Sequence, residues 1–122
     1  MLNVTLPWPA PELSPNGREH WTVKAEAVKA ARTLAWRTAQ EELWLHPVYI
    51  SPDAPLVAHF EFYPPNKRWF DLDNLVSRAK NFQDGLFDAL GINDRLITRT
   101  IADRCGVYPG GKVVIMIERR GE

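Results

Sequence analysis

Hydrophobic and polar residues alternate along several short stretches of the chain, and this alternation predicts β-strands. It is clearest in residues 56–63 (LVAHFEFY), where Leu, Ala, Phe and Phe at alternate positions share one face. Residues 2–6 (LNVTL) follow the same pattern, and two more strands are expected at about 96–103 and 112–118, joined through the turn residues YPGGK. The VVIMI run of the last strand is apolar on both faces, so we expect this strand to be central in a sheet or covered by a partner.

Two longer segments have apolar residues at intervals of three or four, which predicts amphipathic helices over about 22–45 and 74–90. Asp73 is the predicted N-cap of the second helix, and Gly91 is in place for a left-handed C-terminal cap. The order strand, helix, strand, helix, strand, strand predicts an α+β fold, one domain over residues 1–122 in which two main helices pack on a mixed four-stranded sheet. The predicted stripe of the first helix consists of Val28, Ala31, Ala35, Ala39 and Leu43, and that of the second consists of Leu75, Ala79, Phe82, Leu86 and Leu90.

The charge balance limits the kind of partner that the chain can hold. Fifteen basic and fifteen acidic residues cancel, so an overall positive field for nucleic acid is absent, and a polyanion must be held by a local patch or through a metal ion. Cys105 is the single cysteine, which fits a cytoplasmic protein with a half-buried thiol. We expect no membrane association, because no apolar run approaches the ~20 residues that span a bilayer and the first residues do not resemble a signal peptide.

Two carboxylates, Asp71 and Asp73, stand at the predicted start of the second helix in KRWFDLDNLVSRAK. Capping is one interpretation, since an aspartate there accepts hydrogen bonds from free backbone amides. A metal site is the other, because Asp94 follows the same helix and three carboxylates from two segments can hold Mg²⁺. Nearby cations could bind the phosphates of a phosphodiester substrate, and surface ion pairing is the other explanation for them. They are Lys67, Arg68, Arg78, Lys80, Arg95 and Arg99.

Helical geometry and aromatic residues add two further observations around these acids. At ~100° per residue, a polar row that begins at Asp73 falls opposite the apolar stripe, as a solvated face also would. The row continues through Ser77, Lys80, Asp84 and Asp88. Trp69 and Phe70 precede the acids; burial is the commoner use of such side chains, and stacking on an exposed base or wedging into a junction is the alternative. The tryptophans at 8, 21, 36, 44 and 69 are expected mainly in the core or at an interface.

Four pieces of the sequence, LPWPAP with SPNGREHW, then DLDNL, KNFQDGL and GIND, together resemble the RusA Holliday junction resolvases, particularly their prophage-type members. The resemblance runs in the correct order over nearly the whole chain. It implies a small homodimeric endodeoxyribonuclease that cuts four-way DNA junctions symmetrically with Mg²⁺ and leaves 5′-phosphate ends.

The resemblance also implies roles for individual residues. The essential acids of the family match Asp71, Asp73 and Asp94, which would hold Mg²⁺. Lys80, four residues before Asp-Gly-Leu, matches the active-site lysine, which would stabilise the growing charge of the phosphate or orient water. Asn74 completes the Asp-x-Asp-Asn motif and would support a ligand carboxylate or a metal-bound water. The expected contacts to the DNA backbone are Asn16, Arg18, Lys24, Lys67 and Arg68.

The sequence departs from the family pattern at two positions. Lys80 comes about one helical turn later than in the best-known type, and Asn93 stands where many relatives carry a second acid. A non-catalytic junction-binding module of the same fold is therefore one alternative, and a small structural or interaction protein is the other. An isologous dimer would match the two-fold symmetry of a junction, with its interface at the VVIMI strand or at Val76 and Phe87.

Overall fold

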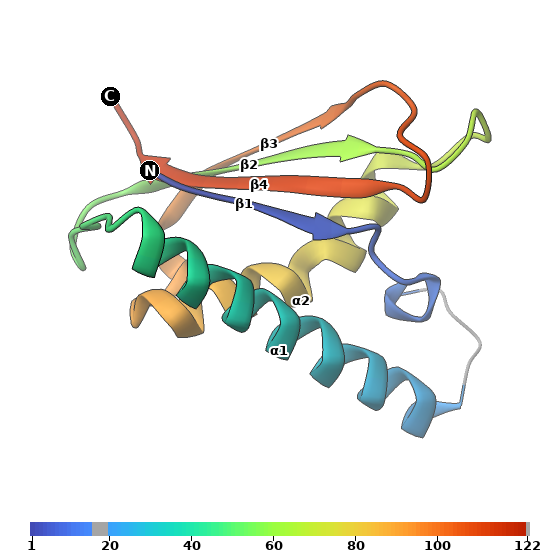
Figure 1. Cartoon of the computed structure of the whole chain (residues 1–122), viewed down its shortest axis with the longest axis horizontal. Coiled ribbons are helices and arrows are strands. Elements are labelled where there is room, and N and C mark those ends of the chain that lie inside the picture. The colour runs from blue at the N-terminus through green and yellow to red at the C-terminus, as the bar shows by residue number, and fades with distance from the viewer. Residues whose placement is uncertain (16–19, 122) are drawn as a thin grey trace.

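Two long helices cover one face of a mixed four-stranded sheet, as Figure 1 shows. The computed structural model of the protein describes residues 1–15 and 20–121, so the expected DNA contacts Asn16 and Arg18 lie outside the described residues. The predicted α+β order is confirmed. The elements are β1 (Leu2–Pro7), the 3₁₀ turn η1 (Pro11–Leu13), α1 (Trp21–Leu45), β2 (Leu56–Tyr63), α2 (Leu72–Leu90), the 3₁₀ turn η2 (Asp94–Leu96), β3 (Ile97–Arg104) and β4 (Lys112–Arg119).

The strands lie in the order β1-β4-β2-β3, with β2 and β3 parallel and the other neighbours antiparallel. The doubly apolar strand β4 is central, as predicted, and pairs with β1 on one side and β2 on the other. Because β2 and β3 run in the same direction, the chain must cross back between them, and α2 provides this connection. The crossing puts the start of α2 at one end of the sheet and η2 at the other (Figure 1).

The core forms between the helices and the inner face of the sheet. The alternating residues of β2, from Leu56 to Phe62, are buried against the alanine stripe of α1 and the apolar stripe of α2. The helices approach closely at Gly85: a Cβ there would lie 2.2 Å from the carbonyl oxygen of Arg32 and 2.8 Å from Cβ of Ala35. The absence of a side chain at position 85 therefore permits this spacing between α1 and α2.

The start of α2 corrects one prediction and its end confirms another. The helix begins at Leu72 and its N-cap is Asp71, not Asp73: the Asp71 carboxylate accepts a hydrogen bond from the Asp73 amide at 3.0 Å. Asp73 lies in the first turn instead. Gly91 ends the helix with φ of 70°, the expected left-handed cap.

Most of the tryptophans lie on the surface, so a core position is wrong for these, and an interface position stays a prediction. Only Trp8 packs against the core, where its ring meets Phe62 and Phe70 edge-on. The other four, at positions 21, 36, 44 and 69, are 42–85% exposed. The three in α1 fall outside the alanine stripe that faces the sheet, and aromatic character alone does not reveal this.

Phe87 was a candidate for the dimer interface, but it is buried in the core of its own chain and offers almost no surface to a partner. Val76 is half-buried against the same core. No helix in residues 1–15 and 20–121 is both long and apolar enough to cross a membrane.

Candidate functional site

The exposed side of α2 carries a row of charged side chains that starts at its N-terminus. Asp71 and Asp73 are both exposed there, where the unpaired amides and the helix dipole favour negative charge. The capping bond uses only one of the two Asp71 carboxylate oxygens, so capping and ion binding are compatible. Lys80 follows on the same side of the helix about 10 Å further along the axis, at ~1.5 Å per residue.

Lys80 and Asp94, taken from two separate motifs, are neighbours: Nζ of Lys80 lies 3.6 Å from Oδ2 of Asp94. The turn η2 makes this possible, because it follows the Gly91 cap and returns the chain alongside α2. Asn93 caps η2, since its side chain accepts a hydrogen bond from the Arg95 amide at 2.9 Å. Asparagine and aspartate are equally good caps, so Asn93 leaves the turn that presents Asp94 intact.

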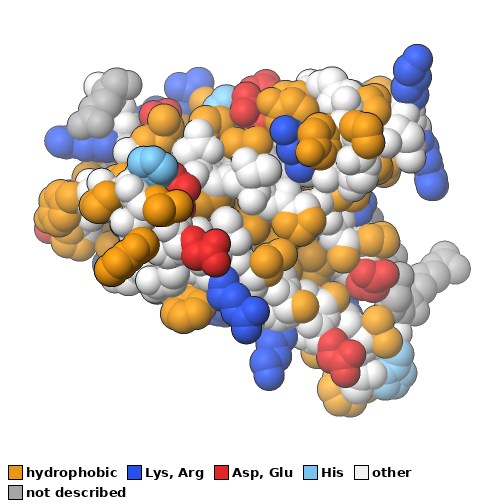
Figure 2. Space-filling view, in the orientation of Figure 1, with side chains coloured by type: hydrophobic (Ala, Val, Ile, Leu, Met, Phe, Trp, Pro, Cys, Tyr) orange, Lys and Arg blue, Asp and Glu red, His pale blue; other side chains and the backbone are white. Residues whose placement is uncertain are grey.

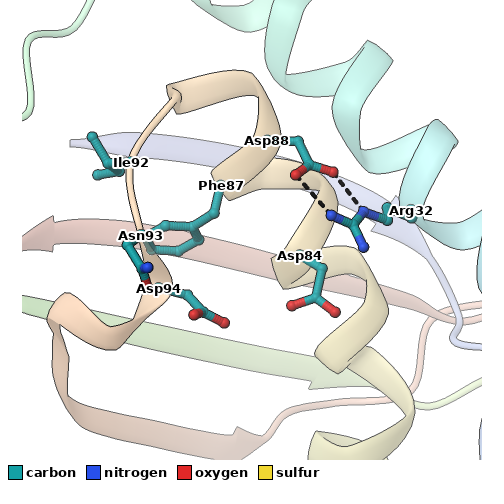
Figure 3. A pocket seen from close by; sticks show the side chains of 7 residues that line it. All are labelled: Arg32, Asp84, Phe87, Asp88, Ile92, Asn93 and Asp94. Atoms are coloured by element: carbon teal, nitrogen blue, oxygen red, sulfur yellow. Dashed lines mark hydrogen bonds and ion pairs between the residues drawn. The ribbon is translucent and has the colours of Figure 1, made fainter.

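A cleft of about 280 Å³ separates this turn from α2 and α1 (Figure 3). The carboxylates of Asp84 and Asp94 lie across it from one another, and Arg32 of α1 closes one side through hydrogen bonds of 2.6 and 2.9 Å to Asp88. Burial raises the pKa of Asp84, and the charge of Asp94 raises it further while Lys80 opposes the shift. Asp84 and Arg32 line this cleft although they are not among the predicted site residues, and Asp84 follows Lys80 by one turn in the predicted polar row.

The three predicted carboxylate ligands are not gathered at one point. In the described part of the chain, no three His, Cys, Asp or Glu side chains form a group that could hold a metal ion. The length of α2 explains this, because Asp84 lies about 16 Å along the axis from Asp73 and Asp94 lies beside Asp84. Mg²⁺ at phosphate-processing sites commonly takes one or two carboxylates together with substrate phosphates and water. Asp71 and Asp73 fit that smaller donor set.

The proline-rich segment before residues 16–19 is held against the first turns of α2. Nδ2 of Asn74 donates to Oγ of Ser14 at 2.7 Å, and Nζ of Lys24 in α1 donates to the Ser14 carbonyl at 3.1 Å. Arg78 was grouped with the cations around the acids, but it is only 7% exposed, and its Nε and Nη2 both donate to the Pro9 carbonyl. Burial lowers the pKa of Arg78. These contacts bring Ser14, the first residue of the SPNGREHW motif, beside Asn74, which directly follows Asp73.

The remaining predicted contacts, Lys67 and Arg68, are exposed in the loop that leads from β2 to Asp71. Neither forms an ion pair with another residue in the described ranges. Positive and negative side chains are interspersed over the face seen in Figure 2, in agreement with the balanced net charge. Attraction of a polyanion therefore depends on local groups such as these two.

The fold and this charged helix face define a small α+β protein with candidate chemistry along α2. No protein-family model matches the chain. An uncharacterized protein of Xylella fastidiosa (strain Temecula1) is 40% identical over 117 residues, which make up 96% of this chain and 76% of the Xylella protein. The chain belongs to the same family as that protein.

Proposed function

We propose that this protein is a Mg²⁺-dependent, structure-selective endodeoxyribonuclease of the RusA type, which resolves four-way DNA junctions by paired hydrolysis of phosphodiesters in the cytoplasm. The observation that carries the proposal is the contact of 3.6 Å between Lys80 and Asp94 on the helix face that begins with Asp71 and Asp73. Two residues that the resemblance selects from separate motifs, one in α2 and one in η2, thus meet beside the exposed face of α2.

The residues along α2 have separate tasks in this proposal. Asp71 and Asp73 offer carboxylate oxygens to Mg²⁺, which when bound would neutralise a phosphate oxygen and activate a water. Lys80 donates to the same DNA strand further along the helix, because Asp94 positions its ammonium group and an ammonium has three donors. Asn74 secures Ser14 beside the acids, so it supports the site through the proline-rich segment.

DNA binding would combine basic groups from the loop before α2 and from the start of α1. Lys67 and Arg68 approach the acids from the loop before α2, and Lys24 lies beside Ser14 on the other side. Asn16 and Arg18 complete the set as predicted contacts. A homodimer would present two such faces related by the two-fold axis of a junction. Steep loss of affinity with salt is expected if several phosphates are contacted.

Cleavage of a labelled four-way junction with and without Mg²⁺ tests the proposal. We expect Mg²⁺-dependent paired nicking by the wild type and a loss of at least ~100-fold in Asp73→Asn, with junction binding kept or strengthened because a charge near phosphate is removed. Asp53→Asn, at an exposed loop position between α1 and β2, is the matched control and should cleave like the wild type. Absence of cleavage by the wild type, or full activity of Asp73→Asn, contradicts the nuclease assignment.

Asp94 has two possible roles that one titration separates. If it positions Lys80, Asp94→Asn lowers the cleavage rate at saturating Mg²⁺ without changing the Mg²⁺ concentration at half-maximal rate. If it is the third ligand predicted from the sequence, that concentration rises, because a charged oxygen donor is lost. Wild-type rates and an unchanged Mg²⁺ requirement would show that Asp94 does neither.

A non-catalytic junction-binding module of the same fold is the second candidate. The absence of a group of three ligands within residues 1–15 and 20–121 is the observation that favours it. It predicts junction binding without nicking at any Mg²⁺ concentration. A structural or interaction protein, in contrast, would bind a junction no better than linear duplex and show no metal-dependent thermal shift.

A further inference from the structure

A groove of about 340 Å³ opens between the loop before α2 and the loop after β3. Three cations line it, Lys67, Arg68 and Arg104, and no carboxylate of the described residues does. Trp69, Phe70 and Val107 contribute aromatic and apolar walls. In a chain with no net charge, a groove whose described charged side chains are all positive favours an anionic occupant over a neutral or basic one.

Trp69 and Phe70 are adjacent in the chain but have opposite surroundings. Phe70 turns inward and packs edge-on against Trp8, with the ring centroids 5.1 Å apart. Trp69 is 77% exposed, and the Arg104 guanidinium lies 4.2 Å from its ring centroid. Nη2 of Arg104 also donates to the Phe70 carbonyl at 2.8 Å, so one arginine ties the loop and the indole together. The indole is thus held in place at the surface without serving the core.

We propose that this groove binds one unpaired nucleotide of DNA, with its base stacked on Trp69 and its phosphates held by Lys67 and Arg68. Stacking on an aromatic side chain requires a free base face, and the neighbours in a duplex cover both faces of each base. An unpaired nucleotide meets this requirement, and its flanking phosphates match the cations of the groove. Arg104 covers one face of the Trp69 ring, so the base would stack on the opposite face of this exposed indole.

The position of the groove connects it to the acids. Trp69 is two residues from Asp71 in a short loop, so a nucleotide on its ring would lie at the approach to the N-terminus of α2. This inference rests on the proposed function for its DNA substrate, because the base pairs at the exchange point of a branched junction are easier to open than those inside a continuous duplex. It adds selectivity: branched DNA would be preferred over linear duplex because the branch supplies a base to the groove more easily.

Binding without Mg²⁺ tests the groove separately from cleavage. Fluorescence anisotropy with labelled oligo(dT) of ten nucleotides and with a ten-base-pair duplex compares Trp69→Ala, Trp69→Phe and Trp44→Ala. Trp44→Ala is the matched control, because Trp44 is also an exposed tryptophan, at 85%, and lies near the C-terminal end of α1. We expect Trp69→Ala to weaken oligo(dT) binding about 10-fold, since one base loses its stacking partner, and to change duplex binding less than ~2-fold. Trp69→Phe keeps an aromatic face and should stay near the wild type, as should Trp44→Ala.

The outcomes distinguish this inference from the proposed function. Three outcomes overturn the proposed nucleotide site in the groove. They are that Trp69→Ala binds oligo(dT) as tightly as the wild type does, that it loses oligo(dT) and duplex binding equally, or that the wild type itself fails to bind oligo(dT). Trp69-dependent binding that is tighter for oligo(rU) than for oligo(dT) overturns its assignment to DNA. A wild type that binds oligo(dT) through Trp69 but never cleaves junctions leaves the groove standing and removes the nuclease assignment.

Discussion

Replacing Gly85 by alanine tests the closest contact between the two helices. Alanine is favoured over glycine inside a helix by about 1 kcal/mol, so on local grounds the substitution would stabilise α2. The tertiary contact opposes this gain: the new Cβ would lie 2.2 Å from the Arg32 carbonyl oxygen and 2.8 Å from Cβ of Ala35. Neither neighbour can rotate away, because one is backbone and the other is a methyl group fixed to it.

Relief therefore requires α1 and α2 to separate, which loosens the core between them. Overpacking of this kind costs about 1–3 kcal/mol, and a clash with backbone belongs at the upper end. After the gain in helix propensity, we expect a net loss of about 2 kcal/mol in the free energy of unfolding. For a domain of this size that corresponds to a fall of about 8 °C in Tm.

Thermal and urea unfolding, followed by circular dichroism, measure the effect. Gly91→Ala is the matched control, because Gly91 has φ of 70° and no neighbour within 4 Å of an added Cβ. It should lose only the ~1–2 kcal/mol of left-handed strain, and Gly91→Asn should recover most of that loss. A Gly85→Ala protein as stable as the wild type would refute the reasoning, since the helices could then separate without cost.

Three further predictions concern side chains of α2. Arg78→Ala should cost about 2–4 kcal/mol in urea unfolding, because it leaves the Pro9 carbonyl without its donor and removes a buried side chain; a loss below ~1 kcal/mol would contradict the buried contact. Asp71→Ala should cost about 1 kcal/mol in Tm-derived stability and Asp71→Asn almost nothing, since asparagine also caps; equal losses would argue against the cap. Folding raises the pKa of Asp84, so its charge opposes stability as pH rises above its unfolded pKa, whereas the lowered pKa of Asp88 adds stability that disappears as pH falls through its folded pKa. Between pH 3 and 7, Asp84→Asn should therefore make stability rise more with pH and Asp88→Asn should make it rise less; the same sign for both would refute the two shifts.

The order and type of the elements could be predicted because they depend on short-range patterns. The alternation in β2 and the alanine stripe of α1 each define one buried face, and the doubly apolar run of β4 indicates a strand with neighbours on both sides. The start of α2 was placed two residues late because Asp71 and Asp73 are equally acceptable caps. Only the backbone bend at the end of the preceding loop decides between them.

The candidate site was predicted as a set of residues but not as an arrangement. Sequence selected Lys80 and Asp94, yet their contact depends on how η2 returns along α2. Arg78 looked like one more surface cation, although it is buried on the Pro9 carbonyl. The sequence is compatible with a buried Trp69, whereas in the folded chain its ring is exposed and lies against Arg104.

By itself the sequence determined the strands, the helices and the chemical character of the loop before α2, because hydrophobic periodicity and caps act between residues close in the chain. The tertiary structure decided which charged groups meet, since their separations depend on the crossing of α1 and α2 at Gly85 and on the length of α2. That length keeps Asp94 beside Lys80 and Asp84 and away from Asp71 and Asp73, a separation that no local pattern encodes.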